Sequence, residues 1–433
     1  MPKKARHPEF SVSLATDHFL WGVATSAFQI EGFIKNDMTE WEMQGRFNQN
    51  GKNPSYHNAC MSWRYMEKDL ELLKNLNVNA YRFSMDWGRL QPAPHTFDTK
   101  ALNHYERLVD KLLDSQITPM LTLHHFTHPV WFHKQTPWIE ENSIESFANF
   151  TEYIIQKFHK KIKLFITFNE PVVWVLAAYG DAIFPPGEKN LTHMAIALKH
   201  MLLAHKRAYE IIKSYDSQAQ IGLANNFISF EPERQWHVLD RGFTLLVHRL
   251  YNLSIPEAFL TNHIKIYFPL LINFRADIPL NNQIDFWGIN YYYRMHLRFQ
   301  LHRKLPIQMN FHDRSKHGLS DLGWEIYPEG LWKVMRWLKA TNKPFYITEN
   351  GIADGKDKKR LKFIQSHLAL VEKARREQLP LKGYFYWSLL DNYEWLEGLN
   401  ARFGLYEVDY TNHCQRKLRE SGKWYSEFIS QSD

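Results

Sequence analysis

The chain is short of cysteine and of long apolar runs. It has 433 residues and two cysteines, Cys60 and Cys414, so at most one disulfide can form, which excludes a small disulfide-held scaffold. We expect both to be free thiols in a reducing compartment. No run approaches the roughly 18 consecutive apolar residues of a transmembrane helix, and the basic N-terminal segment has no apolar region of signal-peptide type. These features predict a cytoplasmic protein that does not bind membranes.

Glycine and proline are also scarce, at 19 each, which is unusual for a β protein rich in loops. We find no internal repeat, low-complexity segment or linker, so residues 1–433 are expected to form one domain. Lys and Arg exceed Asp and Glu by 53 to 46, and this net charge of +7 is scattered along the chain. The densest basic cluster, Lys356–Arg360, is interrupted by an acid and is expected to be a solvated loop. Nucleic acid is therefore not an expected partner.

Aromatic residues, by contrast, are plentiful. The chain has 29 Phe, 21 Tyr and 15 Trp, which together make up 15% of it. So many apolar anchors exclude a disordered chain. A large core can absorb such rings, but sugar-binding sites also use them, because an aromatic face stacks on the apolar C–H face of a pyranose.

Short apolar or β-branched runs alternate with longer segments of helical period. The predicted strands are Phe19–Gln29, Ala80–Met85, Pro119–His125, Leu164–Asn169, Gln220–Asn225, Asp285–Tyr292, Pro344–Glu349 and Leu381–Leu389. The predicted helices are Trp63–Leu76, Lys100–Ser115, Ser143–Phe158, His193–Tyr215, Gly330–Lys339 and Leu361–Gln378. Eight strands in such units predict an α/β fold, a single (β/α)8 TIM barrel with its active site at the C-terminal ends of the strands.

Two of the predicted strands end in a glutamate. Glu170 ends the fourth and Glu349 the seventh, and in a closed barrel these strands face each other across the mouth. Both carboxyl groups can therefore point into one pocket. Cleavage of a glycosidic bond needs such a pair, with one carboxyl protonated as the acid and the other ionised. The sequence thus indicates a glycosidase site.

Neighbouring residues suggest which glutamate has which role. Arg82 ends the second strand and can keep Glu349 ionised by its charge and hydrogen bonds. Tyr292 can donate a hydrogen bond to the same carboxylate. Asn169, next to Glu170, can reach a sugar hydroxyl beside the reacting carbon.

These motifs resemble those of glycoside hydrolase family 1, the β-glucosidase family. The resemblance is carried by Thr-Phe-Asn-Glu-Pro at 167–171, Ile-Thr-Glu-Asn-Gly at 347–351, the N-terminal signature at 19–32 and Trp-Ser-Leu-Leu-Asp-Asn-Tyr-Glu-Trp at 387–395. Shorter matches lie at 81–84, 288–292, 323–325, 402–405 and 408–410. The resemblance covers about residues 17–428 in the order of the family.

The resemblance implies a retaining β-glucosidase without a cofactor or metal, acting on a small β-glycoside or an oligosaccharide. Glu349 would be the nucleophile and Glu170 the acid/base, with Arg82 and Tyr292 as further catalytic residues. The residues implied in substrate binding are Gln29, His125, Asn169, Asn290, Trp324, Trp387, Glu394, Trp395 and Phe403. Gln29 and Glu394 would hold the hydroxyls farthest from the reacting bond, and Trp387 would form a stacking platform.

The sequence suggests three other interpretations. His124, His125 and His128 could form a metal site, but neighbouring strand residues point to opposite faces. A related group cleaves 6-phosphorylated sugars, yet Glu394 would repel a phosphate, and Ala401 and Phe403 stand where that group has Lys and Tyr. A non-catalytic carbohydrate-binding barrel would lack one of the two glutamates. The sequence leaves the natural aglycone, the order of gluco-, galacto- and fuco-substrates and the oligomeric state open.

Overall fold

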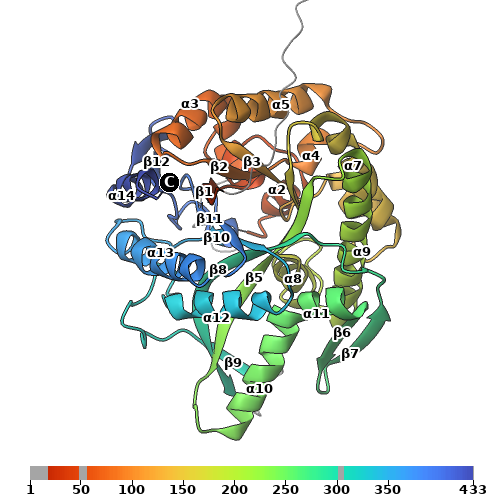
Figure 1. Cartoon of the computed structure of the whole chain (residues 1–433). Coiled ribbons are helices and arrows are strands. Elements are labelled where there is room, and N and C mark those ends of the chain that lie inside the picture. Colours follow the sequence, from red (N-terminus) through yellow and green to blue (C-terminus); the bar gives the residue numbers. More distant parts are fainter. Residues whose placement is uncertain (1–17, 48–55, 301–306, 433) are drawn as a thin grey trace, which may run out of the picture.

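The computed structural model describes residues 18–47, 56–300 and 307–432, and a parallel β-barrel lies at its centre (Figure 1). Its strands are β1 (Leu20–Ala24), β2 (Ala80–Ser84), β3 (Thr118–His124), β4 (Leu164–Asn169), β5 (Gln220–Pro232), β8 (Phe286–Phe299), β10 (Phe345–Asn350) and β11 (Leu381–Trp387). Each pairs in parallel with the next, and β11 pairs with β1, which closes the barrel. The prediction of a (β/α)8 TIM barrel is confirmed.

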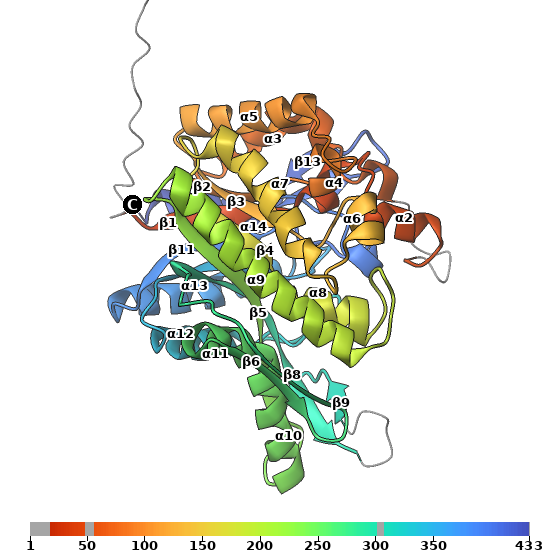
Figure 2. The ribbon, with the colours of Figure 1, turned by 90° about the vertical axis from the view of Figure 1, so that its right-hand side faces the viewer.

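Helices cover the outside of this barrel (Figures 1 and 2). The main ones are α3 (Ser62–Asn75), α5 (Thr99–Asp114), α7 (Asn142–Phe158), α9 (Leu191–Tyr215), α12 (Pro328–Lys339), α13 (Arg360–Arg376) and α14 (Glu420–Ser430). Helix α5 shows why they form: Asp98 caps it by accepting from the backbone amides of Lys100 and Ala101. Its apolar residues recur at helical spacing and are buried against the barrel, among them Leu102 and Val109.

The barrel interior is a packed core and not a pore. Small and large side chains from alternate strands fill it, including Ala24, Met120, Ile166, Phe286 and Phe385. The larger apolar layer lies outside, between strands and helices. The interior is therefore closed below, and only the C-terminal ends of the strands are left to form a site.

The predicted first strand, Phe19–Gln29, is too long. Strand β1 ends at Ala24, and residues Ala27–Glu31 form the short helix α1. The side chain of Ser84 accepts a hydrogen bond from the amide of Ala27 at 2.7 Å, and the chain turns there. Gln29 therefore lies on a helix above the barrel and not at a strand end.

Two other strands extend beyond their predicted ends. Strands β5 and β8 run on to Pro232 and Phe299, and β9 (Ile307–Asn310) pairs with β8 antiparallel. Asn290 and Tyr292 thus lie inside β8 and not at its end. Pairing of β5 with β8 continues past the barrel as far as Pro232 and Leu297, which offers each extension backbone partners.

Helix α14 was not predicted, and neither were several further elements. They are α2 (Asp37–Met43), α4 (Trp87–Leu90), α6 (Val130–Gln135), α8 (Pro171–Val175), α10 (Val238–His248), α11 (Ser254–Thr261), the hairpin β6 (His263–Phe268) and β7 (Ile272–Asp277), and the hairpin β12 (Tyr406–Asp409) and β13 (Gln415–Leu418). They are short or lie in the connections between barrel units. Within the described ranges, no helix is long and apolar enough to cross a membrane. Cys60 and Cys414 are free and buried, as expected.

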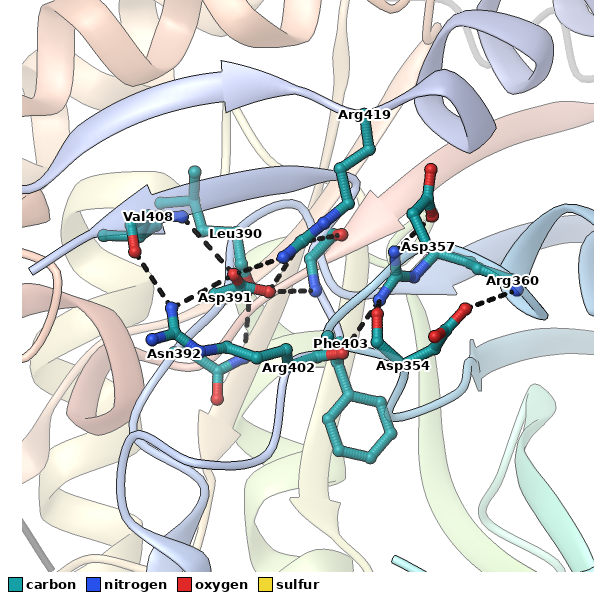
Figure 3. A network of polar contacts seen from close by, with 12 residues as sticks. Asp354, Asp357, Arg360, Leu390, Asp391, Asn392, Arg402, Phe403, Val408 and Arg419 are labelled. Atoms are coloured by element: carbon teal, nitrogen blue, oxygen red, sulfur yellow. Dashed lines mark hydrogen bonds and ion pairs between the residues drawn. The ribbon is translucent and has the colours of Figure 1, made fainter. Parts of the chain in front are cut away.

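The cluster Lys356–Arg360 is only partly a solvated loop. Figure 3 shows that Arg360 turns inward, and its side chain is fully buried. Its guanidinium donates to the backbone oxygen of Arg402 at 2.8 Å and forms an ion pair with Asp357. The sequence alone cannot show that Arg360, unlike its neighbours, has buried carbonyl and carboxylate partners.

Candidate active site

A cavity of about 280 Å³ opens at the C-terminal ends of the strands. Eleven of the thirteen predicted site residues line it: Gln29, His125, Asn169, Glu170, Tyr292, Trp324, Glu349, Trp387, Glu394, Trp395 and Phe403. The other two, Arg82 and Asn290, are almost completely buried and hydrogen-bond to lining residues. The fold thus brings together in one pocket residues from most of the length of the chain.

Glu170 lies where β4 passes into α8. Its backbone is left-handed, with φ of +46°, and its amide donates to the carbonyl oxygen of Ala224 at 2.7 Å. Pro171 then begins α8, a position that suits its fixed φ. A non-glycine residue held in this region is strained, and such strain is common at functional sites. The turn points the Glu170 carboxyl into the cavity.

Amides surround the Glu170 carboxyl. Asn290 donates to Glu170 Oε1 at 2.7 Å and Asn226 donates to the same atom at 3.1 Å. Burial and the nearby charge of Glu349 raise the pKa of Glu170 to about 8, although the two amides oppose this rise. Glu170 therefore keeps its proton at neutral pH as long as Glu349 carries a negative charge.

Glu349 lies at the end of β10 among charge-stabilising groups. Arg82 Nη1 donates to Glu349 Oε1 at 2.6 Å, and the Tyr292 hydroxyl donates to Oε2 at 2.5 Å. Burial raises the pKa of Glu349, and the charge of Arg82 and the bond from Tyr292 act against this rise. A cation bonded directly to the carboxylate distinguishes Glu349 from Glu170, so Glu349 is the carboxyl that ionises more readily.

Gly351 lets this strand end approach β11. A Cβ atom at this position would lie only 1.8 Å from the backbone oxygen of Trp387. Only glycine therefore fits here, and it brings the Glu349 segment against Trp387, which itself lines the cavity.

Arg82 also joins Glu349 to the neighbouring strands. Its Nη2 donates to Asn169 Oδ1 at 2.6 Å and its Nε donates to Thr122 at 3.1 Å. Asn169 Nδ2 in turn lies 3.1 Å from His125 Nε2. These bonds fix the side chains of β2, β3, β4 and β10 relative to one another before any ligand binds, which lowers the cost of ordering them on binding.

Gln29 and Glu394 lie side by side at one corner of the cavity. Gln29 Nε2 donates to Glu394 Oε2 and to Asn392 Oδ1, each at 3.0 Å, and Ser26 donates to Gln29 Oε1 at 2.7 Å. Burial and the charge of Glu349 raise the pKa of Glu394 to about 8. This corner presents hydrogen-bonding groups of fixed orientation, which suits a polyhydroxylated ligand.

Aromatic rings form the remaining walls. The rings of His125 and Trp387 are nearly parallel, with centroids 5.9 Å apart. On the opposite side Trp324 packs against Tyr292 and Phe403, at centroid distances of 6.0 and 6.2 Å. A pocket with polar groups at its base and rings at its sides fits the two faces of a sugar ring.

Comparison with known proteins identifies the family of this chain. Residues 13–433 match the family described as glycosyl hydrolase family 1. The chain belongs to this family. As a β-glycosidase of family 1 it is also similar to individual members, both in sequence and in structure.

The curated relatives share about a third of its residues. Beta-glucosidase A of Thermotoga maritima is 33% identical over 95% of the chain and 96% of its own length. A beta-galactosidase of Pyrococcus woesei is 30% identical over 91% of the chain and 92% of its own length.

Two solved structures show the same fold. A beta-glycosidase from Pyrococcus horikoshii superposes with a TM-score of 0.87 at 34% identity, covering 95% of this chain and 93% of that one. A family 1 β-glucosidase from Thermotoga maritima in complex with isofagomine lactam gives 0.82 at 29% identity, covering 95% and 97%.

The three histidines that could form a metal site do not face the same cavity. His125 faces the cavity, whereas His124 points the other way and contacts His128 at 2.8 Å between their Nε2 atoms. His128 Nδ1 lies 2.8 Å from Asp37 and its Nε2 accepts from Trp138. No group of three or more His, Cys, Asp and Glu in the part of the chain that the structure describes could hold a metal ion.

Sequence reasoning missed several lining residues. Tyr251 and Tyr293 line the cavity, as do Ile183 and Phe184. The Tyr251 hydroxyl donates to Asn226 Oδ1 at 2.8 Å, which orients the amide that contacts Glu170. Asn226 had a signal, since it follows a predicted strand, whereas Tyr251 lies in a π-helical turn, Arg249–Leu253, that no sequence pattern marked.

Proposed function

We propose that this β-glycosidase hydrolyses terminal non-reducing β-D-glucosyl residues with retention, through a covalent glycosyl-enzyme. The observation that carries this proposal is the asymmetric environment of the two carboxyls. Glu349 is bonded to Arg82 and Tyr292, whereas Glu170 is bonded to amides alone and keeps its proton at neutral pH.

In the first step a Glu349 carboxylate oxygen attacks the anomeric carbon. The bond between that carbon and the glycosidic oxygen breaks, and Glu170 donates its proton to the leaving oxygen. Arg82 and Tyr292 hold the attacking carboxylate in place through its two oxygens, one each. The product of this step is a glycosyl ester of Glu349 and the free aglycone.

In the second step water attacks the same carbon from the face that the aglycone left. Glu170 now takes the proton from this water. The negative charge that raises the pKa of Glu170 is lost once Glu349 is esterified, so the pKa falls and Glu170 becomes a base. Two inversions at one carbon restore the β configuration.

The corner of the cavity that contains Gln29 and Glu394 supports glucose as the sugar. Gln29 and Glu394 lie side by side there and can each bond hydroxyl groups at the end of the ring away from the reacting carbon. No Lys or Arg is among the described residues that line the cavity, so a 6-phosphate would lack a cationic partner. The similar Thermotoga maritima protein is a beta-glucosidase, and the Pyrococcus woesei beta-galactosidase makes terminal β-D-galactosyl residues the second candidate.

Glu349→Ala tests the proposal. Without the nucleophile no glycosyl-enzyme forms, so the variant should lose turnover of 4-nitrophenyl β-D-glucoside by about 10⁴-fold or more. Azide should restore a reaction that gives the α-glycosyl azide, seen by NMR. Activity of wild-type size in Glu349→Ala would overturn the assignment.

The wild-type enzyme tests the alternative that the substrates are 6-phosphorylated β-glucosides. We expect a clear kcat/KM for the aryl β-D-glucoside and none of use for its 6-phosphate. Glu394→Ser should lower the first by about fivefold to a hundredfold, the cost of one or two hydrogen bonds to sugar hydroxyls. A wild-type preference for the 6-phosphate would move the protein to the phospho-sugar group.

A further inference from the structure

A second cavity lies on the side of the barrel, away from the catalytic glutamates. It measures about 530 Å³, within the range of small-molecule sites. Its lining residues come from the connection between α4 and α5, from α6 and its C-terminal end, and from α7; these helices lie next to one another in Figure 2. The lining residues are Gln91, Pro94, His95, Phe97, Trp131, Gln135, Thr136, Ser146, Asn149, Glu152, Tyr153 and Gln156.

The aromatic members are held in place by contacts with one another and with neighbouring residues. Trp131 Nε1 donates to the backbone oxygen of Gln91 at 2.8 Å, and its ring meets Trp87 at 90° with centroids 6.2 Å apart. Phe97 and Tyr153 stack on each other, 3.8 Å apart and 16° from parallel. All three cavity-lining rings are partly exposed. Rings already fixed lose little freedom when a ligand stacks on them.

The polar residues that line this cavity have hydrogen-bonding groups that no other described residue uses. The amides of Gln135 and Asn149 make no hydrogen bond to any described residue, and both side chains are exposed. Glu152 accepts from the Tyr215 hydroxyl at 3.1 Å, which leaves acceptor positions free. Amide and carboxylate groups beside rings can bind hydroxyl groups while the rings cover C–H faces.

The charge of the cavity excludes anionic ligands. No Lys or Arg belongs to its described lining, and Glu152 would repel a phosphate or carboxylate. The cavity therefore favours a neutral ligand with many hydroxyls.

The two cavities share one connection. His125 and Phe126 follow β3 and line the catalytic cavity, and Trp131 in the next helix lines the second one. Trp131 is five positions after Phe126, so their Cα atoms lie at most about 18 Å apart. The second cavity is thus within reach of the face at which the substrate enters.

From these observations we propose that this second cavity is a non-catalytic binding site for neutral oligosaccharides. The inference goes beyond the proposed catalytic function, because it needs neither glutamate. It implies that the protein holds a sugar chain at two places, with catalysis at one.

The test counts binding sites by calorimetric titration with cellotetraose. Glu349→Ala serves as the parent protein, so that the ligand survives the measurement. We expect two sites in the parent. Asn149→Trp, added to the parent, places a large ring on an exposed helix position inside the second cavity, and should remove one site or weaken it at least tenfold.

Glu145→Trp is the matched control. Glu145 is also exposed on α7, lies outside both cavities and forms only a surface ion pair with Arg207. It should keep both sites. A single site in the parent, or two equal sites in Asn149→Trp, would overturn the inference. Release of glucose by Glu349→Ala during the titration would instead contradict the catalytic assignment, so the two failures are distinguishable.

Discussion

At the scale of single residues, surroundings rather than residue type separate the two glutamates. Both are buried, and burial raises the pKa of each. Only Glu349 has a cation at hydrogen-bond distance, Arg82 at 2.6 Å. A proton shared between two such carboxyls resides on the one without the cation, which is Glu170.

Glu170→Ala should therefore affect substrates unequally. Poor leaving groups need protonation, so their kcat/KM should fall by about 10²–10⁴-fold. Aryl substrates with good leaving groups should still form the glycosyl-enzyme and then stall, which appears as a burst followed by a slow rate. Equal losses on both substrates from the first turnover would show that Glu170 is not the acid.

We expect Tyr251 to position Glu170 through Asn226. Tyr251→Phe leaves Asn226 Oδ1 without its donor, so the Asn226 amide loses its fixed orientation toward Glu170. That amide lowers the pKa of Glu170, and its loss should raise this pKa further. The basic limb of the kcat/KM profile, where Glu170 loses its proton, should move up by about 0.5–1 pH unit, since one neutral hydrogen bond is worth about 0.5–1.5 kcal/mol.

Tyr293→Phe is the control for this shift. Tyr293 lines the same cavity, and its hydroxyl makes no hydrogen bond to another described residue. Its basic limb should coincide with that of the wild type. An unmoved limb in Tyr251→Phe, or equal shifts in both variants, would contradict the role of Tyr251.

At the scale of elements, the segment after β11 depends on a buried ion pair. Arg419, just before α14, donates to both oxygens of Asp391 at 2.8 Å (Figure 3). Asp391 is fully buried and also accepts from the amide of Gly404 at 2.9 Å. Because Glu394 follows three residues after Asp391, Arg419 helps to fix a cavity-lining segment from outside the pocket.

Arg419→Ala should destabilise the protein strongly. Arg402 at 3.3 Å would be the only cation left beside the buried Asp391 carboxylate among the described residues, so the cost in the free energy of unfolding should lie near the lower end of the range of about 3–5 kcal/mol expected for breaking a buried pair. Chemical denaturation measures this loss, and KM should rise as the Glu394 segment loosens. Lys423→Ala, which breaks an exposed pair with Glu420 on the same helix, should change stability by less than about 0.5 kcal/mol. Similar losses in the two variants would contradict the argument.

At the scale of the whole molecule, the pocket lowers stability at high pH. The pKa of Glu170 is about 8 in the folded protein, against 4.5 for an ordinary Glu. The folded state therefore holds a proton that the unfolded state releases. The stability due to this proton is fully present below about pH 4.5 and is lost as pH rises to about 8.

Glu170→Gln should remove the part of this pH dependence that is due to Glu170, while the part due to Glu394, whose pKa is also about 8, remains. Between these pH values the wild type should lose up to about 1.4 kcal/mol per pH unit relative to the variant, the effect of one proton. Urea denaturation of both proteins over this range measures the difference. The variant should be the more stable one near pH 8 although it is inactive on poor leaving groups, an exchange of stability for activity that is common at active sites. Parallel stability curves would contradict the raised pKa.

The sequence determined the barrel, because apolar periodicity and strand–helix alternation are local properties. It also indicated part of the pocket, since strand ends of a parallel barrel meet at one face. Glu170, Glu349 and Arg82 were predicted on this ground alone. The roles of Gln29 and Glu394 needed the family resemblance as well.

Only the tertiary structure decided what depends on partners distant in the sequence. The bond from Tyr251 to Asn226 spans 25 residues and that from Arg82 to Glu349 spans 267. Helix α1 replaced the end of a predicted strand where Ser84, 57 residues away from Ala27, binds the turn. Arg360, expected in solvent, found buried oxygen partners in segments that the chain brings back to it. Hydrogen bonds and burial, which set the pKa of each group, arise from packing and are not encoded in any local pattern.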